Sequence, residues 1–251
     1  TWNTEAAEKG GYEHFMLKEI MEQPRAVKAT VEPRIRDGRI TLEGFELTDD
    51  ELKDINKIVI TACGSAYHAG CVGRYVIEEL CRIPVQTVYL PDIEDEYGVR
   101  ERLVSLAEEK GAQVTYVTKE TADTLGDTVL TIYPPVQSGG DLNELGLTAL
   151  ASTGDFDLLI TGDMSGSTEK KLVETYALPD IEVLVVSHHG SRYSSNIRFL
   201  KAVTPEAAVI SVGDNNYGHP SEETLQRLLA VGADIWRTDQ QGTIRITVNG
   251  G

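Results

Sequence analysis

Three short apolar runs in the second half of the chain each lead into polar side chains, and this pattern constrains the fold most. The run at residues 157–161 leads to Asp163, and the run at 181–186 leads to His188 and His189. The run at 207–212 leads to a cluster that contains His219. Apolar runs separated by helical patterns indicate buried strands of an α/β protein, which places its chemistry on the loops at strand ends.

The rest of the chain alternates in the same way, so we predict an α/β fold throughout. Pro24 is expected to interrupt or restart the first helix. The last two strands, 234–238 and 243–248, are expected to form a hairpin around residues 239–242. Apolar spacing and turn residues predict helices at 12–21, 67–80, 99–110, 169–175, 195–203 and 222–231, and further strands at 57–62, 85–90, 113–117, 128–133 and 146–151.

Charge and cysteine content bear on partners and compartment. The formal net charge of −17 disfavours nucleic acid as a partner unless a bound metal offsets it. No apolar run approaches the roughly 20 residues of a membrane span, and the first residues carry no signal-peptide pattern. Cys63, Cys71 and Cys81 form no Cys-x-x-Cys pair, which favours a reducing cytoplasm. Because no methionine opens the chain, we expect a trimmed fragment.

A Gly/Ser turn between a strand and a helix lies in the first third of the chain. The strand at 57–62 runs through Gly64 and Ser65 into the helix predicted at 67–80. Free amide N–H groups at a helix N-terminus attract anions, and glycine permits close backbone approach. Turns of this kind are also common without any ligand, so spacing alone leaves both interpretations open.

The sequence around this turn resembles that of a known family. Residues 7–20, the following Glu22-Gln23-Pro24 and Ala62-Cys63-Gly64-Ser65-Ala66-Tyr67-His68-Ala69-Gly70 resemble the isomerase (SIS) domain of glutamine–fructose-6-phosphate aminotransferases. The resemblance covers residues 1–86 and implies that Gly64 and Ser65 line a sugar-phosphate site. The family's nucleophilic cysteine, second phosphate-binding loop and later acid–base residues have no counterpart here. We therefore expect a sugar-phosphate-binding fragment without turnover.

The polar clusters of the second half suit a metal. Carboxylate and imidazole groups together bind Zn, Mn or Fe, and a bridging carboxylate can hold two cations for hydrolysis. Asp163 is equally well placed to cap a helix. Adjacent histidines on a strand point in opposite directions, so we expect only one of His188 and His189 to be a ligand.

Longer motifs in this region resemble a second family. The motifs Leu159-Ile160-Thr161-Gly162-Asp163, Val186-Ser187-His188-His189-Gly190-Ser191 and Tyr217-Gly218-His219-Pro220 resemble the metallo-β-lactamase-like domain of ComEC-type DNA-uptake proteins. The resemblance implies a Zn- or Mn-dependent phosphodiester hydrolase. It makes Asp163 a metal ligand, His188 or His189 the late ligand or a substrate-side group, and His219 a residue of the pocket rim. Nucleic acid as a partner, and membrane attachment of the parent protein, follow from this resemblance alone.

The family's first half carries a His-x-His-x-Asp-His or His-x-Asp-x-Asp-His motif, which this chain lacks. We therefore expect impaired activity, with a weak mononuclear site, a site completed by another chain, or no site. Residues 1–86 would form the isomerase-domain fragment, a βα unit. Residues 87–251 would form the C-terminal half of a metallo-β-lactamase-like αββα sandwich.

No flexible linker separates the two pieces. The chain thus reads as a chimera whose origin, whether natural fusion, artefact or design, the sequence leaves open. An unpartnered half-sandwich is expected to self-associate. Three functions follow as hypotheses: an impaired metal-dependent hydrolase, a sugar-phosphate-binding module and an inert composite.

Overall fold

The computed structural model describes residues 15–36, 39–40, 48, 86–93, 99–109, 111–139 and 142–248. Its first element is helix α2 (Phe15–Val31), followed by the 3-10 turn η1 (Glu32–Arg34) and the short antiparallel strands β1 (Ile35–Arg36) and β2 (Arg39–Ile40). Helix α2 continues through Pro24, so the expected interruption is wrong. An interior proline removes one helical hydrogen bond and crowds the preceding turn, at a cost of about 3 kcal/mol. The predicted strand at 57–62, the helix at 67–80, and Gly64 and Ser65 lie outside the described residues.

A small parallel unit follows Gln86. Strand β3 (Thr87–Pro91), helix α5 (Val99–Glu109) and strand β4 (Gln113–Val117) form a two-stranded parallel sheet, with Thr87 opposite Gln113. Val117 of β4 is buried against Leu130 and Ile132 of the larger sheet, and Tyr89 of β3 packs on the same cluster. The predicted strands and helix of this region are therefore confirmed, in a sheet of their own.

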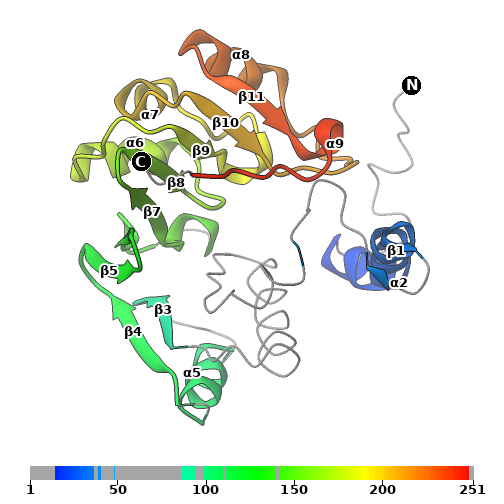
Figure 1. Ribbon diagram of the computed structural model, residues 1–251, viewed down its shortest axis with the longest axis horizontal. Coiled ribbons are helices and arrows are strands. Elements are labelled where there is room, and N and C mark those ends of the chain that lie inside the picture. Colours follow the sequence, from blue (N-terminus) through cyan, green and yellow to red (C-terminus); the bar gives the residue numbers. More distant parts are fainter. Residues whose placement is uncertain are drawn as a thin grey trace.

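The larger sheet has seven strands in the order β11-β10-β9-β8-β7-β6-β5 (Figure 1). The first four strands in chain order pair antiparallel, and β8 to β11 run parallel to one another. Strand β5, which pairs with β6, was not predicted from the sequence. The strands are β5 (Thr121–Leu125), β6 (Thr128–Tyr133), β7 (Thr148–Thr153), β8 (Phe156–Ile160), β9 (Val183–Val185), β10 (Ala207–Ile210) and β11 (Asp234–Arg237).

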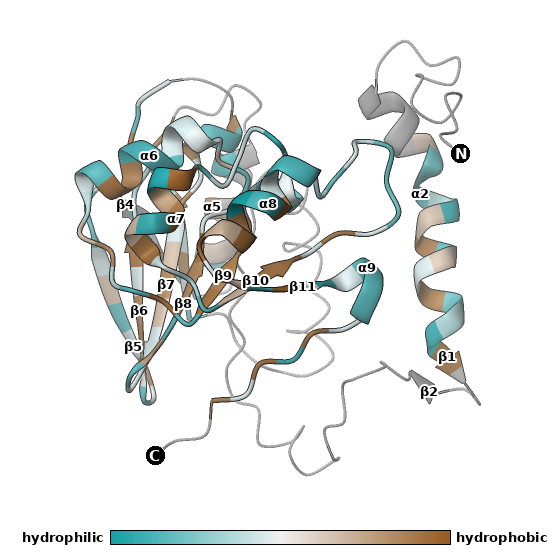
Figure 2. Ribbon diagram, turned by 90° about the horizontal axis from the view of Figure 1, so that it is seen from above, coloured by the Kyte–Doolittle hydropathy of each residue, from teal (hydrophilic) through white to brown (hydrophobic). Residues whose placement is uncertain are grey.

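Three helices cover one face of this sheet (Figure 2). They are α6 (Gly166–Thr175), α7 (Ile197–Val203) and α8 (Glu222–Ala230), each preceded by a strand. Leu159, Leu184 and Ile210 point from three strands into a core that Leu172, Phe199, Leu200, Val203 and Leu228 complete from the helices. The alternation of buried and half-buried residues along β10 matches a strand whose other face is less covered. The expected α/β architecture is confirmed.

The end of the chain differs from the expected hairpin. Strand β11 leads into the short helix α9 (Thr238–Gln241), and residues 243–248 form no strand. The Thr238 hydroxyl accepts a hydrogen bond from Val212 N (2.7 Å) and donates one to Val212 O (2.6 Å), while the Gln241 amide oxygen accepts from Arg237 N (2.7 Å). These contacts favour a helical turn where a hairpin loop was predicted. In the part of the chain that the structure describes, no helix is long and apolar enough to span a bilayer.

Candidate functional site

The loops that follow β8, β9 and β10 meet at one edge of the sheet because these strands are parallel and in register. Ile160 lies opposite Val185, and Val185 lies opposite Val209. Asp163 therefore emerges beside the histidine pair, and the loop after β10 emerges on the other side of that pair. The parallel register therefore brings the three polar clusters to one edge of the sheet.

His188 and His189 lie in a tight turn, η3 (Ser187–Gly190), and not on a strand. Both have left-handed backbones, with φ of 50° and 53°, a conformation that costs a non-glycine residue about 1–2 kcal/mol. Their rings are 6.5 Å apart and nearly perpendicular, at 83°. The prediction that they alternate across a strand is therefore wrong, because β9 ends at Val185.

His189 faces Asp163. Its Nδ1 lies 2.7 Å from the carbonyl oxygen of Ser211, and since a carbonyl can only accept, this nitrogen carries the hydrogen. In the neutral ring, Nε2 then keeps its lone pair, and it lies 3.8 Å from Asp163 Oδ1. Two acceptors that face each other at this distance leave room for a proton or a cation. A backbone carbonyl behind the distal ring nitrogen is the usual way in which proteins orient a metal-binding histidine.

His219 lies next to the histidine turn, with its ring 5.7 Å from that of His188 and 6.0 Å from that of Tyr217. Its Nδ1 is buried and has no hydrogen-bond partner among the described residues. Burial lowers the pKa of His219, and the neighbouring rings of His188 and His189 lower it further. The uncharged imidazole is therefore favoured.

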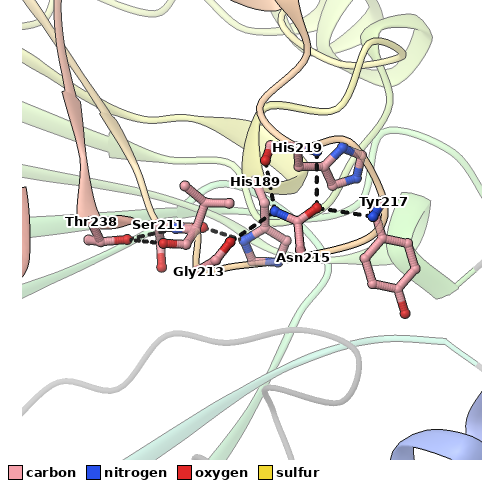
Figure 3. Close-up of a pocket in the computed structure, with 8 residues that line it drawn as sticks. His189, Ser211, Gly213, Asn215, Tyr217, His219 and Thr238 are labelled. Atoms are coloured by element: carbon pink, nitrogen blue, oxygen red, sulfur yellow. Dashed lines mark hydrogen bonds between the residues drawn. The ribbon is translucent and has the colours of Figure 1, made fainter. Parts of the chain in front are cut away.

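These groups border an open pocket of about 390 Å³ at the sheet edge (Figure 3). His189 and His219 line it from two different loops, and Thr238 closes it from the end of β11. The remaining lining residues are Ser211, Val212, Gly213, Asn215 and Tyr217. Asp163, His188, His189 and His219 thus lie close together. Of these four residues, only His189 and His219 line this pocket.

A buried carboxylate on helix α6 is hydrogen-bonded to the histidine turn. Glu169 of α6 has no exposed surface and accepts hydrogen bonds from Ser187 Oγ (2.6 Å), Ser195 N (2.8 Å) and Asn196 N (2.6 Å). Ser187 Oγ also lies 2.6 Å from Thr161 Oγ1, so this network joins the loops after β8 and β9. Burial raises the pKa of Glu169, while the donated hydrogen bonds and Arg227 act in the opposite direction.

The sequence analysis did not identify Glu169 and Asn215, whose hydrogen bonds hold the histidine turn and the loop of His219. Glu169 reads as one of several polar residues of a surface helix, and only its spacing of six residues from Asp163 sets it apart. Asn215 belongs to the Asn-Asn-Tyr-Gly-His cluster that contains His219, so this cluster could have indicated Asn215 as well. The Glu144 side chain, which accepts from Ser165 Oγ at 3.0 Å just after Asp163, carried no sequence signal.

A complete metal centre does not fit these residues. Zinc takes four ligands, and catalytic zinc sites draw three of them from the protein. No group of three or more His, Cys, Asp or Glu side chains in the described part of the chain is arranged to hold a metal ion. The Asp163–His189 pair offers two donors, and at about 2.1 Å from a tetrahedral zinc they would lie about 3.4 Å apart, close to the observed 3.8 Å.

Comparison with known proteins finds sequence relatives for part of the chain and distant structural neighbours. No known family profile matches the chain. Isomerizing glutamine–fructose-6-phosphate aminotransferases match by sequence: that of Clostridium tetani is 48% identical over 128 residues, and that of Caldanaerobacter subterraneus is 50% identical over 125 residues. These matches cover about half of this chain, 50% and 49%, and 20% of either relative, so the chain spans about a fifth of their length.

The matched half has a consequence for the expected boundary. Half of a 251-residue chain cannot fit within residues 1–86, so the sequence similarity extends past Gln86 wherever it begins. The division at residue 86 therefore remains a prediction. The similarity to the aminotransferase isomerase region is itself confirmed.

Solved structures of metallo-β-lactamase-fold proteins are also similar to this chain, at low sequence identity. The metallo-β-lactamase-fold protein YhfI of Bacillus subtilis covers 74% of this chain and 76% of its own, with a TM-score of 0.46 and 8% identity. A metal-dependent hydrolase of the β-lactamase superfamily covers 66% of this chain and 73% of its own, with a TM-score of 0.41 and 13% identity. Likeness at this level does not decide a function, which must be argued from the residues themselves.

Proposed function

We propose that the C-terminal part of the chain carries an incomplete site of a metal-dependent hydrolase of the metallo-β-lactamase class. One observation carries this proposal: Asp163 Oδ1 and His189 Nε2 face each other at 3.8 Å while Ser211 O fixes the imidazole from behind. The motifs that contain Asp163, His189 and His219 support the class. With two donors in place, the site binds Zn²⁺ or Mn²⁺ weakly, and turnover needs ligands from elsewhere.

The residues present would divide the work between cation and substrate. Asp163 and His189 would bind the cation, and His219, which lines the open pocket, would face the substrate. A cation held there would act as a Lewis acid and polarise the phosphoryl or carbonyl oxygen of an ester. The phosphodiester or nucleic-acid substrate class rests on the ComEC-type motifs, and a cation would also offset the repulsion between a polyanion and a chain of net charge −17.

Metal should raise the thermal stability of the intact chain, and Asp163→Ala should abolish the rise. A ligand at a hundredfold excess over its dissociation constant adds about 2.7 kcal/mol, or about 5–10 °C for a chain of this size. The measurement is a thermal melt with and without Zn²⁺ or Mn²⁺. Asp180→Ala, an exposed aspartate that accepts from Thr204, is the matched control and should keep the rise. A rise that persists in Asp163→Ala would place the cation elsewhere and remove the basis of the proposal.

A second function is favoured by the aminotransferase similarity. We propose that the N-terminal part of the chain, residues 1–86, binds a sugar phosphate through Gly64 and Ser65 without converting it. An identity of 48% over half the chain supports this proposal. Fructose 6-phosphate should bind in a calorimetric titration, and Gly64→Val should weaken binding at least about tenfold by blocking backbone approach. Equal binding by the wild type and Gly64→Val would exclude this turn as the site.

Two expectations about the whole chain also remain proposals. Self-association is supported by Trp236, whose side chain is 47% exposed on the edge strand β11. A cytoplasmic location is supported by three cysteines without disulfide spacing.

A further inference from the structure

The loop that carries Tyr217 and His219 into the pocket is folded around one side chain, that of Asn215 (Figure 3). The Asn215 amide nitrogen donates to Gly213 O at 2.9 Å and to His219 O at 2.8 Å. Its amide oxygen accepts from Tyr217 N at 3.0 Å and from His219 N at 3.1 Å. Four hydrogen bonds from one amide link the beginning and the end of the loop.

This set of partners requires an amide. The two carbonyl oxygens can only accept, and the two backbone N–H groups can only donate, so the side chain must offer both donors and an acceptor. An aspartate of the same shape keeps the acceptor but loses both donors, and it places a carboxylate against two carbonyl oxygens. Repulsion between the carboxylate and the two carbonyl oxygens would displace the side chain from this position.

His219 is the residue that these bonds fix most completely, because its N–H and its C=O are both bound by Asn215. Its ring lies against the ring of Tyr217, with an interplanar angle of 24°, and against the edge of His188. The loop around it, residues 211–220, has no helix or strand to hold it. Beyond it, Ser221 N donates to Gly190 O at 2.9 Å, which ties the loop to the histidine turn.

We infer that Asn215 is the positioning residue of the pocket, which presents the His219 imidazole, stacked on Tyr217, to whatever occupies the cavity. This inference deepens the proposed hydrolase and rests on it for the meaning of the pocket. The geometry itself does not involve the Asp163–His189 pair. The two ideas can therefore fail separately.

The adjacent asparagine gives a matched control. Asn216 is exposed and one position along the same loop, so Asn216→Asp introduces the same charge and the same change of atoms without touching the four bonds. Asn215→Asp removes the two donors and adds a negative charge, and Asn215→Ala removes all four bonds. Because Asn215 lies in an irregular, half-exposed loop, we expect all three variants to fold.

The test is an NMR comparison of the intact wild type with the three variants, without metal or ligand. Asn215→Asp should lose the proton contacts between the Tyr217 and His219 rings, and Asn215→Ala should also exchange the His219 amide hydrogen at least about tenfold faster. Asn216→Asp should match the wild type in both. The ring contacts depend on the local position of the two side chains. A variant that is less stable but still folded would keep them.

Ring contacts and amide exchange that are unchanged in both Asn215 variants would overturn the inference, and so would their equal loss in Asn216→Asp. Absence of any metal effect in the wild type would instead count against the hydrolase and leave the role of Asn215 standing. Loss of the ring contacts in Asn215→Asp, together with an intact metal-induced rise in melting temperature, would confirm Asn215 as a positioning residue for the substrate side of the pocket.

Discussion

Glu169→Ala should lower the free energy of unfolding by about 3–5 kcal/mol, the largest effect expected for any single substitution in the site region. The carboxylate has no exposed surface and is the shared acceptor of Ser187 Oγ, Ser195 N and Asn196 N. Removing it deprives the buried Ser195 N and the half-buried Asn196 N of their acceptor and leaves Ser187 Oγ with Thr161 Oγ1 as its partner. It also leaves a cavity beneath the histidine turn. Each orphaned donor costs about 1–3 kcal/mol, partly relieved where water can enter.

Urea unfolding of the variant and the wild type gives this difference directly. Glu174→Ala is the matched control on the same helix, because Glu174 makes exposed ion pairs with Arg198 at 3.0 Å and Lys170 at 3.9 Å. Exposed pairs contribute about 0–1 kcal/mol, so this control should cost little. If Glu169→Ala cost no more than Glu174→Ala, the buried network would not be what holds the two loops together.

Gly190→Ala should cost about 2–5 kcal/mol and separate the histidine turn from the loop of His219. Gly190 has φ +78°, and a Cβ there would lie 2.6 Å from Pro220 Cβ and 3.1 Å from Pro220 Cα. The left-handed backbone costs an alanine about 1–2 kcal/mol, and the overlap adds about 1–3 kcal/mol. Relief of the overlap requires Pro220 to move, which stretches the bond from Ser221 N to Gly190 O.

Two other glycines separate these two contributions. Gly218 has φ +73° but open space at the Cβ position, so Gly218→Ala should show the backbone cost alone. Gly213 has open space and no left-handed backbone, so Gly213→Ala should be close to neutral. Urea unfolding should rank the three in the order Gly190, Gly218, Gly213. Equal costs at Gly190 and Gly218 would show that contact with Pro220 is not tight.

Periodicity and β-branched runs were enough to predict most of the sheet and its covering helices. Strands β8, β9 and β10 form where apolar residues cluster, and polar residues follow each one, so the meeting of Asp163 with the histidines followed from parallel pairing. Strand β5 escaped prediction because its sequence, Thr121-Ala122-Asp123-Thr124-Leu125, has few apolar residues and depends on its pairing with β6.

The parts that sequence could not predict depend on contacts between distant segments. The left-handed turn at His188 and His189 is held by Glu169 and Gly162, which lie 18 or more residues away. The helix α9 in place of a hairpin depends on Thr238 bonding to Val212. The role of Asn215 becomes apparent only in the folded loop, because no sequence pattern indicates which of two adjacent asparagines turns inward.

The dissociation constant of Zn²⁺ for the intact chain, measured by competition with a chromophoric chelator, tests the central claim most directly. Complete structural zinc sites bind with about 10–16 kcal/mol, which corresponds to dissociation constants from tens of nanomolar down to about picomolar. A pair of donors should bind one Zn²⁺ with a dissociation constant in the micromolar range or higher. Asp163→Ala and His189→Ala should each abolish that binding. Nanomolar binding, or binding that survives loss of either side chain, would contradict an incomplete site built on Asp163 and His189.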